Sequence, residues 1–399
     1  MAQCLDRIIA SMDTGVDDAL ALAYLLGSAD ECELSGVIAS YGNVDANTAY
    51  ANTRAVLDLF GRADIPVFLG SEHPSWADAF IPDAGCAQFH GDDGLGNTWL
   101  AGSGALADGA GVPGDMSGDD MSVDVPDGVV SVGGYLAGDV HAHPALGSYP
   151  RVGRSRSVDR PQSATSTALV SGGTRRCSVD AADGIEYLIE QVREFGRDVT
   201  VLSTGPLTDV DAAITRAPDI ASKLRLVMMG GTLTQPGNCW DAVAETNIIQ
   251  DPEAANRVFH SGADITMVGL DVTHQCLLTR SAADRWRATG TMRGRFLADL
   301  ADFSIKANLE ADTALFSGGM PLHDPLAAAV ALDSSLVDCF DLALRAETNT
   351  GDFNGVRGRT TGDPVGLVNH SMPHVHVALG VDSGRFLDEF AERMAEVCR

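Results

Sequence analysis

The sequence predicts an α/β protein with an open, mostly parallel, Rossmann-like sheet and helices on both faces. Short apolar runs of strand length alternate along the chain with longer segments whose apolar residues recur at helical spacing. Acidic and amide side chains gather where several of these runs end, which is where open α/β sheets bind their ligands. A chain of 399 residues can bury a core large enough for one such domain.

The first strand and helix of this pattern lie within residues 7–27. Ile8 to Met12 is a short, mostly apolar run, as expected for a buried strand. From Asp17 onward the apolar residues recur at helical spacing, and Gly27 can end the helix. The stretch Asp13-Thr14-Gly15-Val16-Asp17-Asp18 therefore places three carboxylates where a strand's C-terminal end meets a helix N-terminus.

These three carboxylates indicate a cation site. A helix N-terminus favours negative charge, but three neighbouring acids repel one another unless a cation or ligand hydroxyls balance them. With no Cys or His near, a hard, oxygen-seeking ion such as Ca²⁺ suits the set better than zinc. An N-cap with ordinary first-turn acids is the alternative; it would explain Asp17 or Asp18, but it gives no reason for Asp13.

The remaining elements follow in the same alternating order. The strand–helix–strand–helix–strand order at the start of the chain predicts parallel pairing. Asn43 follows the second strand and can face the same crevice as the acids, although a turn residue after Gly42 is an equally simple interpretation. Further strands are expected at 34–41, 65–70, 199–204, 224–229, 265–270, 341–347 and 375–379, and helices at 47–59, 184–195, 282–288, 293–310 and from 383.

The composition restricts the possible partners. The formal charge of −28 argues against nucleic acid or an anionic membrane as a ligand. Lysine occurs only at Lys223 and Lys306, and aspartate far outnumbers glutamate. A surface rich in acids and poor in lysine is typical of proteins that work in concentrated salt, although a GC-rich genome alone could replace Lys with Arg.

Cysteine use and hydropathy predict a cytoplasmic protein. The 8 cysteines are scattered without a Cys-x-x-Cys pair, which is typical of reduced thiols rather than of a disulfide framework or a zinc site. No run of apolar residues is long enough for a membrane span. A strand that begins by Ile8 leaves no room for a signal peptide.

The acidic stretch at 13–18 resembles the N-terminal signature of the calcium-dependent nucleoside hydrolases, the inosine-uridine-preferring group. Further blocks resemble this family in the expected order, over roughly residues 5–100 and 181–395. The resemblance implies the nucleoside hydrolase fold and hydrolysis of the N-glycosidic bond of ribonucleosides to free base and ribose. The later blocks are Thr204–Thr208, Met229-Gly230-Gly231 with Gly237-Asn238, Ala244–Asn247 with Asp251–Ala255, Asp271–His274, and His323-Asp324-Pro325.

The resemblance also implies a set of site residues. Calcium would be held by Asp13, Asp18, Asp324 and the backbone carbonyl of Thr204. Asp13 would be the general base for water, and His323 would protonate the leaving base. His90 begins a glycine-rich loop, His90–Gly96, expected beside the nucleobase, whereas His274 is expected to be structural. The ribose would be bound by Asp17, Asn43, Met229, Asn238, Glu245 and Asn247. The expected partner is a small-molecule ribonucleoside, and the expected assembly is a homo-oligomer, either a dimer or a tetramer.

Three features depart from the family pattern. Ser11 stands where the family usually has Asp, two residues before the first calcium ligand, which is expected to loosen metal binding without abolishing it. Thr246 replaces a usual Phe and removes an aromatic wall beside the ribose. Residues 101–180 hold no Lys, Glu or Trp, are rich in Gly, Ser and Asp, and are expected to be a loosely ordered insertion in a single domain spanning 1–399.

Two other functions remain open from the sequence. A non-catalytic nucleoside- or ribose-binding protein could keep the metal site, but binding alone needs neither a base nor an acid. The joint presence of Asp13, Asp17, Asp18, His323 and Asp324 therefore argues against it. A hydrolase of a modified ribosyl substrate is the second alternative, suggested by Thr246 and the expected insertion.

Overall fold

The computed structural model describes residues 5–82, 84–98, 181–239, 243–350, 356–363 and 372–399. The insertion expected at 101–180 lies outside these residues. The segments before and after that gap belong to one compact unit and contribute strands to the same sheet. Within the described residues, no helix is both long and apolar enough to cross a membrane.

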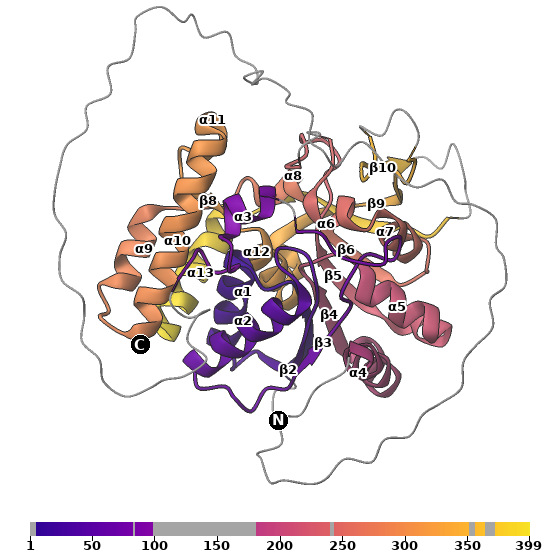
Figure 1. Ribbon diagram of the computed structural model, residues 1–399, viewed down its shortest axis with the longest axis horizontal. Coiled ribbons are helices and arrows are strands. Elements are labelled where there is room, and N and C mark those ends of the chain that lie inside the picture. Colours follow the sequence, from indigo (N-terminus) through magenta and orange to yellow (C-terminus); the bar gives the residue numbers. More distant parts are fainter. Residues whose placement is uncertain (1–4, 83, 99–180, 240–242, 351–355, 364–371) are drawn as a thin grey trace, which may run out of the picture. The chain divides into compact units, whose positions relative to one another are not determined.

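A large, mostly parallel sheet forms the centre of the described chain (Figure 1). Its strand order is β10-β9-β11-β6-β5-β4-β1-β2-β3. Every neighbouring pair from β3 to β11 is parallel, and β9 and β10 add an antiparallel edge. The strands are β1 (Asp6–Met12), β2 (Cys32–Ala39), β3 (Val67–Leu69), β4 (Val199–Ser203), β5 (Arg225–Met229), β6 (Asp264–Val268), β9 (Val337–Ala346), β10 (Thr360–Asp363) and β11 (Val375–Val381). The Rossmann-like sheet predicted from the sequence is confirmed.

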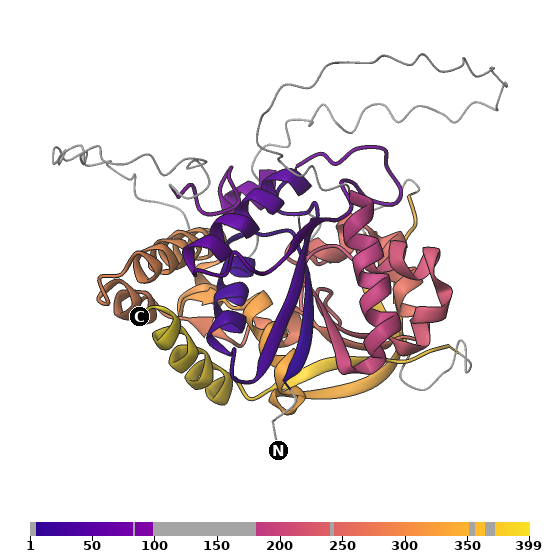
Figure 2. The same cartoon turned by 90° about the horizontal axis from the view of Figure 1, so that it is seen from below.

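Helices cover both faces of this sheet. In Figure 2 the indigo helices from the start of the chain lie on one side of the strands, and the pink helices that follow residue 181 lie on the other. The longer helices are α1 (Val16–Gly27), α2 (Ala46–Leu59), α4 (Ala181–Phe195), α5 (Thr208–Arg216), α7 (Pro252–Phe259), α9 (Arg280–Arg287), α10 (Met292–Ala311), α12 (His323–Leu332) and α13 (Ser383–Val397). The shorter ones are α3 (Ala84–His90), α6 (Thr246–Gln250), α8 (Leu270–Thr273) and α11 (Thr313–Phe316).

The strands alternate their side chains between two hydrophobic cores. In β1, Ile8, Ala10 and Met12 pack in the core under α1, α10, α12 and α13, whereas Ile9 packs in the core under α4, α5 and α7. This is the period of two that a strand buried on both faces requires. Ser11 follows the same alternation and lies on the side of α4 and α5, which becomes important below.

Most long elements lie within a few residues of their predicted positions, and most short ones were not predicted. No expectation covered α3, α6, α7, α8 and α11, the edge strand β10, or the small antiparallel pair of β7 (Leu277–Leu278) and β8 (Met320–Pro321). Helices of one or two turns show too little apolar periodicity to be recognised. One consequence concerns His90, expected to begin a loop, which is instead the last residue of α3.

Candidate active site

The loops after β1, β2 and β4 meet where the strand order changes direction, between β1 and β4. Chain connections leave in opposite directions from this point, so the sheet opens a crevice at its C-terminal edge. A cavity of about 410 Å³ lies here, and it contains most of the expected site residues. It is lined by Val16, Asp17, Asn43, Gly85, Cys86, Gln88, Phe89, His90, Thr204, Met229, Asn238, Cys239, Glu245, Thr246, Asn247, His274, Ser304, Asn308, Phe316, Met320, Pro321, His323 and Asp324.

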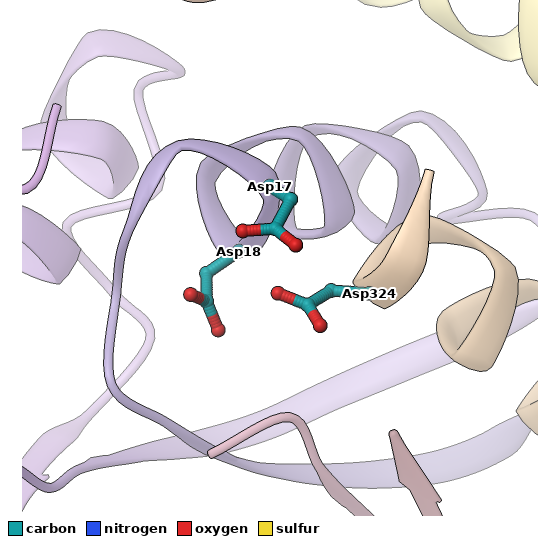
Figure 3. Close-up of side chains that lie close together, drawn as sticks. All are labelled: Asp17, Asp18 and Asp324. Atoms are coloured by element: carbon teal, nitrogen blue, oxygen red, sulfur yellow. The ribbon is translucent and has the colours of Figure 1, made fainter. Parts of the chain in front are cut away.

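Three carboxylates lie close together here, and two of them, Asp17 and Asp324, line the cavity (Figure 3). Asp17 and Asp18 come from the first turn of α1, and Asp324 comes from the first turn of α12. One oxygen from each lies within 4.8 Å of the others, and all three side chains are buried. Such a set of oxygen ligands suits a hard divalent cation.

Hydrogen bonds fix Asp18 and Asp13 while leaving selected carboxylate oxygens unpartnered. Asp18 accepts from the Gly15 backbone N–H at 2.8 Å and from the Thr204 hydroxyl at 2.6 Å. Asp13 Oδ2 accepts from the Asn43 backbone N–H at 2.7 Å. Within the described part of the chain, Asp13 Oδ1 and Asp17 Oδ1 are buried without any hydrogen-bond partner. Buried acceptors of this kind need a ligand, because an unpaired buried polar atom is costly.

The loop after β2 passes so close to Asp13 that it requires a glycine at position 42. A Cβ atom on Gly42 would lie 1.9 Å from Asp13 Oδ2, so any side chain there would displace the carboxylate. Asp13 and Asp18 are fully buried and are not among the residues that line the cavity. The position of Asp13 is thus fixed by close packing as well as by its hydrogen bond.

Burial raises the pKa of every acid in this group. The pKa of Asp17 is raised to about 6 by burial, and that of Asp18 is raised to about 6 by burial and by the charge of Asp17. Burial, and next the charge of Asp18, raise the pKa of Asp13 well above its ordinary range. Burial, and next the charge of Asp17, do the same for the pKa of Asp324. The four acids cannot all be ionised at low cost unless a positive charge binds among them.

Thr204 connects the carboxylate cluster to Asn247. Its hydroxyl donates to Asp18, and its carbonyl accepts from Asn247 Nδ2 at 2.7 Å. A carbonyl oxygen has two lone pairs, so this bond leaves one for another ligand. Asn247 Nδ2 also lies 3.2 Å from the Met229 carbonyl, which ties the ends of β4 and β5 to the start of α6.

Glu245 and Asn238 line the cavity, but much of their bonding capacity is used within the protein. Glu245 is the N-cap of α6 and accepts from the backbone N–H groups of Gly231, Asn247 and Ile248. Asn238 Oδ1 accepts from the Thr246 backbone N–H at 3.0 Å and from its hydroxyl at 3.2 Å. Thr246 therefore holds the side-chain oxygen of Asn238 in place.

Three histidines line the cavity: His90, His274 and His323. His90 Nδ1 accepts from the Val16 backbone N–H at 3.2 Å and lies 3.7 Å from Asp17 Oδ1, and burial lowers its pKa to about 4. His323 Nδ1 lies 2.8 Å from the Thr273 hydroxyl, and burial lowers its pKa well below the usual value. His274 packs against Phe316 and against His323, with ring centres 5.4 and 5.6 Å apart.

The cavity also contains residues that the sequence did not reveal. They come from α3, α10 and the segment around α11, and include Gln88, Phe89, Ser304, Asn308 and Phe316. Asn308 Nδ2 donates to the Ser304 carbonyl and hydroxyl, which fixes both side chains at the wall. In the sequence, only the spacing of Ser304 and Asn308, four residues apart on one helix, could have indicated this wall. The same spacing of polar residues is common on the solvated face of a helix, so it does not identify a site.

The sequence matches that of a known family over almost its full length. The pattern of the inosine-uridine preferring nucleoside hydrolases matches residues 8–388. The chain belongs to this family. The family resemblance drawn from the dispersed motifs is thereby confirmed, as is the α/β fold. Nucleoside hydrolases are N-glycosidases, and the chain is accordingly a hydrolase of this type acting on ribonucleosides.

Individual nucleoside hydrolases show the same similarity from end to end. A pyrimidine-specific ribonucleoside hydrolase from Enterobacter sp. (strain 638) is 30% identical over 390 residues, covering 98% of this chain and 97% of the relative. Its counterpart from Escherichia coli O7:K1 is 29% identical over 388 residues, 97% of each chain. Among solved structures, the purine-preferring ribonucleoside hydrolase from Gardnerella vaginalis is 34% identical with a TM-score of 0.73, covering 98% of this chain and 99% of that one.

Proposed function

We propose that this nucleoside hydrolase uses a Ca²⁺ ion held at the carboxylate cluster, with Asp13 as the general base that activates water. The observation that carries the proposal is the pair of buried, unpartnered oxygens, Asp13 Oδ1 and Asp17 Oδ1, beside the converging acids. The donor set consists of oxygens, which suits Ca²⁺. Asp18, Asp324, Asp13 and the Thr204 carbonyl would hold the ion, and the geometry adds Asp17 as a further candidate ligand.

The cation explains how the acids can be ionised at neutral pH. When bound, Ca²⁺ would supply the positive charge that offsets the raised pKa values and holds the ribose hydroxyls. Asp13 could then accept a proton from water at Oδ1, because its other oxygen is already engaged by the Asn43 N–H. A carboxylate fixed in this way needs no rearrangement during proton transfer.

The ribose would be bound by the polar residues around the cation. Asp17, Asn43, Asn238 and Asn247 line the cavity or its floor with groups that can pair with hydroxyls, while Met229 gives an apolar surface. Glu245 contributes chiefly by fixing α6, which carries Asn247. Interactions that favour a flattened, oxocarbenium-like ring would accelerate cleavage more than interactions that merely bind the substrate.

The leaving base would be received between the histidines and α10. His323 faces this region and is the candidate proton donor, and His90 flanks it. Because burial holds His323 neutral in the free protein, a donor role requires that substrate binding favours its protonation. The relatives include enzymes named for pyrimidine and for purine preference, so both base classes belong in the test.

Two further expectations remain part of the proposal. The scattered cysteines suggest a cytoplasmic enzyme. The family likeness suggests a dimer or tetramer. Size-exclusion chromatography with light scattering would decide the assembly.

The decisive experiment is a panel of purine, pyrimidine and ribose-modified nucleosides assayed for release of free sugar, with and without chelator. We expect turnover that stops on chelation and returns with Ca²⁺. Asp18→Ala should lose metal binding and activity together, since Asp18 joins the cluster to Thr204. A metal-free Asp18→Ala protein with full activity would refute the cation mechanism, and release only from modified ribosides would favour a different substrate.

A further inference from the structure

Ser11 makes a buried contact that explains how the site tolerates its departure from the family motif. The side chain is 1% exposed and lies on the side of the sheet covered by α4 and α5. Its hydroxyl donates to Asp209 Oδ2 at 2.9 Å. A carboxylate is thus present beside position 11, but it is supplied by α5 and not by β1.

Asp209 joins three segments at the C-terminal edge of the sheet. It is fully buried, and besides Ser11 it accepts from the Ser71 backbone N–H at 2.6 Å, just beyond β3. A Cβ on Gly70 would lie 2.4 Å from Asp209 Oδ2, so the chain after β3 packs directly on this carboxylate. The start of α5, the end of β1 and the end of β3 are held together at one side chain.

Ser11 links this junction to the cation region through its backbone. The Ser11 carbonyl accepts from the Thr204 backbone N–H at 2.9 Å, and Thr204 in turn donates its hydroxyl to Asp18. A Cβ on Gly205 would lie 3.1 Å from Asp13 Oδ1, so the turn between β4 and α5 passes against Asp13. Asp209 follows that turn and bonds back to Ser11, closing a ring of contacts around Asp13 and Thr204.

We propose that Asp209 is a positioning residue for the cation site, holding the ends of β1 and β4 at the spacing that Asp13 and Thr204 need. It provides a buried carboxylate from α5 beside position 11, where the related motif has Asp and this chain has Ser11. The inference rests on the proposed cation site and adds the residue that sets its geometry. A carboxylate suits the position because two donors, the Ser11 hydroxyl and the Ser71 N–H, converge on it.

The test moves the carboxylate from position 209 to position 11. Asp209→Asn leaves one acceptor oxygen for two donors, and we expect Ca²⁺ affinity, measured by calorimetry, to fall about 10- to 100-fold, as for other residues that orient metal ligands. Ser11→Asp should weaken affinity as well, because two buried carboxylates would meet. The double variant Ser11→Asp/Asp209→Asn restores one carboxylate and one amide that can pair, and it should recover most of the lost affinity.

Controls separate positioning from general stability. Asp211 lies on the same helix, and its buried carboxylate pairs with Arg257 instead of Ser11. The control variant Asp211→Asn removes this charge. It should leave Ca²⁺ affinity unchanged even where it lowers the melting temperature. Should Asp209→Asn fail to fold, Ser11→Ala removes only the hydroxyl contact, and its affinity for Ca²⁺ should still fall.

The possible outcomes are distinguishable. If the wild-type protein binds no Ca²⁺, the proposed cation mechanism fails. If the wild type binds Ca²⁺ while Asp209→Asn, or Ser11→Ala in its place, binds it equally well, the positioning role is overturned and the mechanism stands. A double variant no better than the worse single variant would likewise overturn the proposal.

Discussion

At this site the protein provides fewer hydrogen-bond donors than the buried carboxylates have acceptor oxygens. Asp13 and Asp17 each keep one buried oxygen without a partner within the described residues, and Asp18 and Asp324 lie close beside them. Burial in a low-dielectric interior disfavours the charged form of each group, and the neighbours add repulsion. The arrangement is therefore costly to the empty protein and favourable once a cation is bound.

The pH dependence of stability should reveal this cost. The pKa values of Asp17 and Asp18 are raised to about 6, above the ordinary value, so the folded state binds protons more tightly than the unfolded state. Their contribution to stability is therefore complete below about pH 4 and is lost as the pH rises through about 6. The cavity histidines His90, His274 and His323 titrate in the opposite sense over the same range, because burial lowers their pKa values. The loss is therefore measured on chelated protein, by denaturant unfolding, as the difference in unfolding free energy between the wild type and Asp17→Asn/Asp18→Asn, and it should be on the order of a few kcal/mol between these pH values.

Saturating Ca²⁺ should remove most of this loss at pH 7, because a ligand at 100 times its Kd adds about 2.7 kcal/mol. The Asp17→Asn/Asp18→Asn variant keeps the three histidines, so their contribution cancels when it is compared with the wild type. A stability difference between the chelated wild type and this variant that stays constant from about pH 4.5 to about pH 7 would contradict the assignment.

The leaving-group role of His323 gives a second prediction. A purine leaves poorly as an anion, whereas nitrophenolate is stable, so a general acid matters for inosine and little for a nitrophenyl riboside. His323→Ala should lower kcat/KM for inosine by about 10²- to 10⁴-fold while nearly sparing the nitrophenyl substrate. Asp13→Asn should impair both, since each needs the activated water. Equal losses on both substrates for His323→Ala would assign His323 to the cavity wall.

Site residues followed from the sequence when their chemistry is carried by local motifs. Asp17 and Asp18 stand at a helix start that the sequence pattern indicates, Asp324 was added by the resemblance to the family, and the structure brings the three together. The contact between Ser11 and Asp209 was not predictable, because 198 residues separate the partners and serine at a strand end has many simple explanations. The capping role of Glu245 was missed because α6 is too short to show a helical period.

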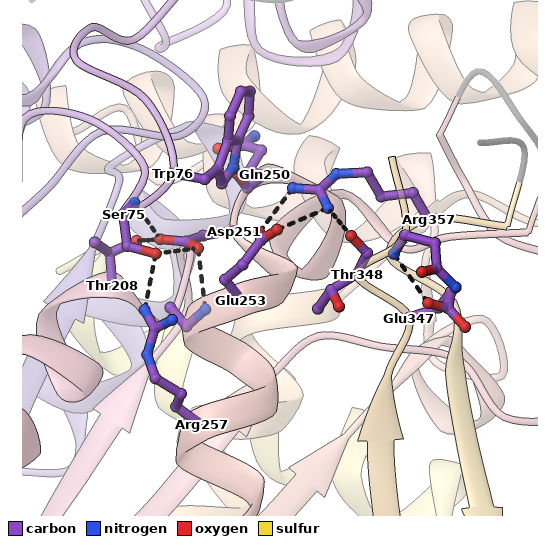
Figure 4. A network of polar contacts seen from close by, with 12 residues as sticks. Ser75, Trp76, Thr208, Gln250, Asp251, Glu253, Arg257, Glu347, Thr348 and Arg357 are labelled. Carbon is purple, nitrogen blue, oxygen red and sulfur yellow. Dashed lines mark hydrogen bonds and ion pairs between the residues drawn. The ribbon is translucent and has the colours of Figure 1, made fainter. Parts of the chain in front are cut away.

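At the scale of elements, the start of α7 connects several segments near the site through one side chain. Asp251 is the N-cap of α7, accepts from Ala254 N–H, and also accepts from the backbone and hydroxyl of Ser75 and from Thr208 (Figure 4). Thr208 also contacts the buried Tyr41 hydroxyl at 2.7 Å. One carboxylate therefore ties α5, α7 and the loop after β3, which leads to α3 and the cavity wall.

Removing this cap should cost more than removing an ordinary one. Asp251→Ala leaves several buried donors without a partner, each costing about 1–3 kcal/mol. Asp45→Ala is the matched control, since Asp45 caps α2 at the surface with bonds to Asn47 and Thr48 N–H groups, and should cost about 0.5–2 kcal/mol. Urea unfolding of both variants measures the difference. Equal losses would show that the Ser75 and Thr208 contacts add nothing to stability.

Long elements were predictable because burial imposes a period on many residues at once. The alternation in β1 and the helical spacing in α1 are of this kind. The antiparallel β10 and the short helices depend on distant partners and carry no such signal. Thus the parallel sheet followed from the sequence, while its strand order and the cavity wall that α3, α10 and α11 form did not.

The whole molecule carries a formal charge of −28, which should make its stability depend on salt. Self-repulsion weakens as counterions screen it. Exposed pairs such as Arg193–Asp219 and Arg287–Asp299 should weaken with salt, but surface pairs of this kind contribute little to stability because water already screens them. We therefore expect the melting temperature to rise from low to molar KCl. Sucrose of equal osmotic strength serves as the control, and a melting temperature that is constant or falls with KCl would contradict salt adaptation.

The distribution of the acids along the chain has a consequence for synthesis. Asp13, Asp17 and Asp18 leave the ribosome early, and Thr204 follows, but Asp324 emerges only near the end of translation. Nascent chains generally fold from the N-terminus, so the early acids are made before their last partner exists. A chain that stops before α12 could build most of the parallel sheet and still lack a complete ion-binding set. Cation capture would thus mark finished chains and distinguish them from truncated ones.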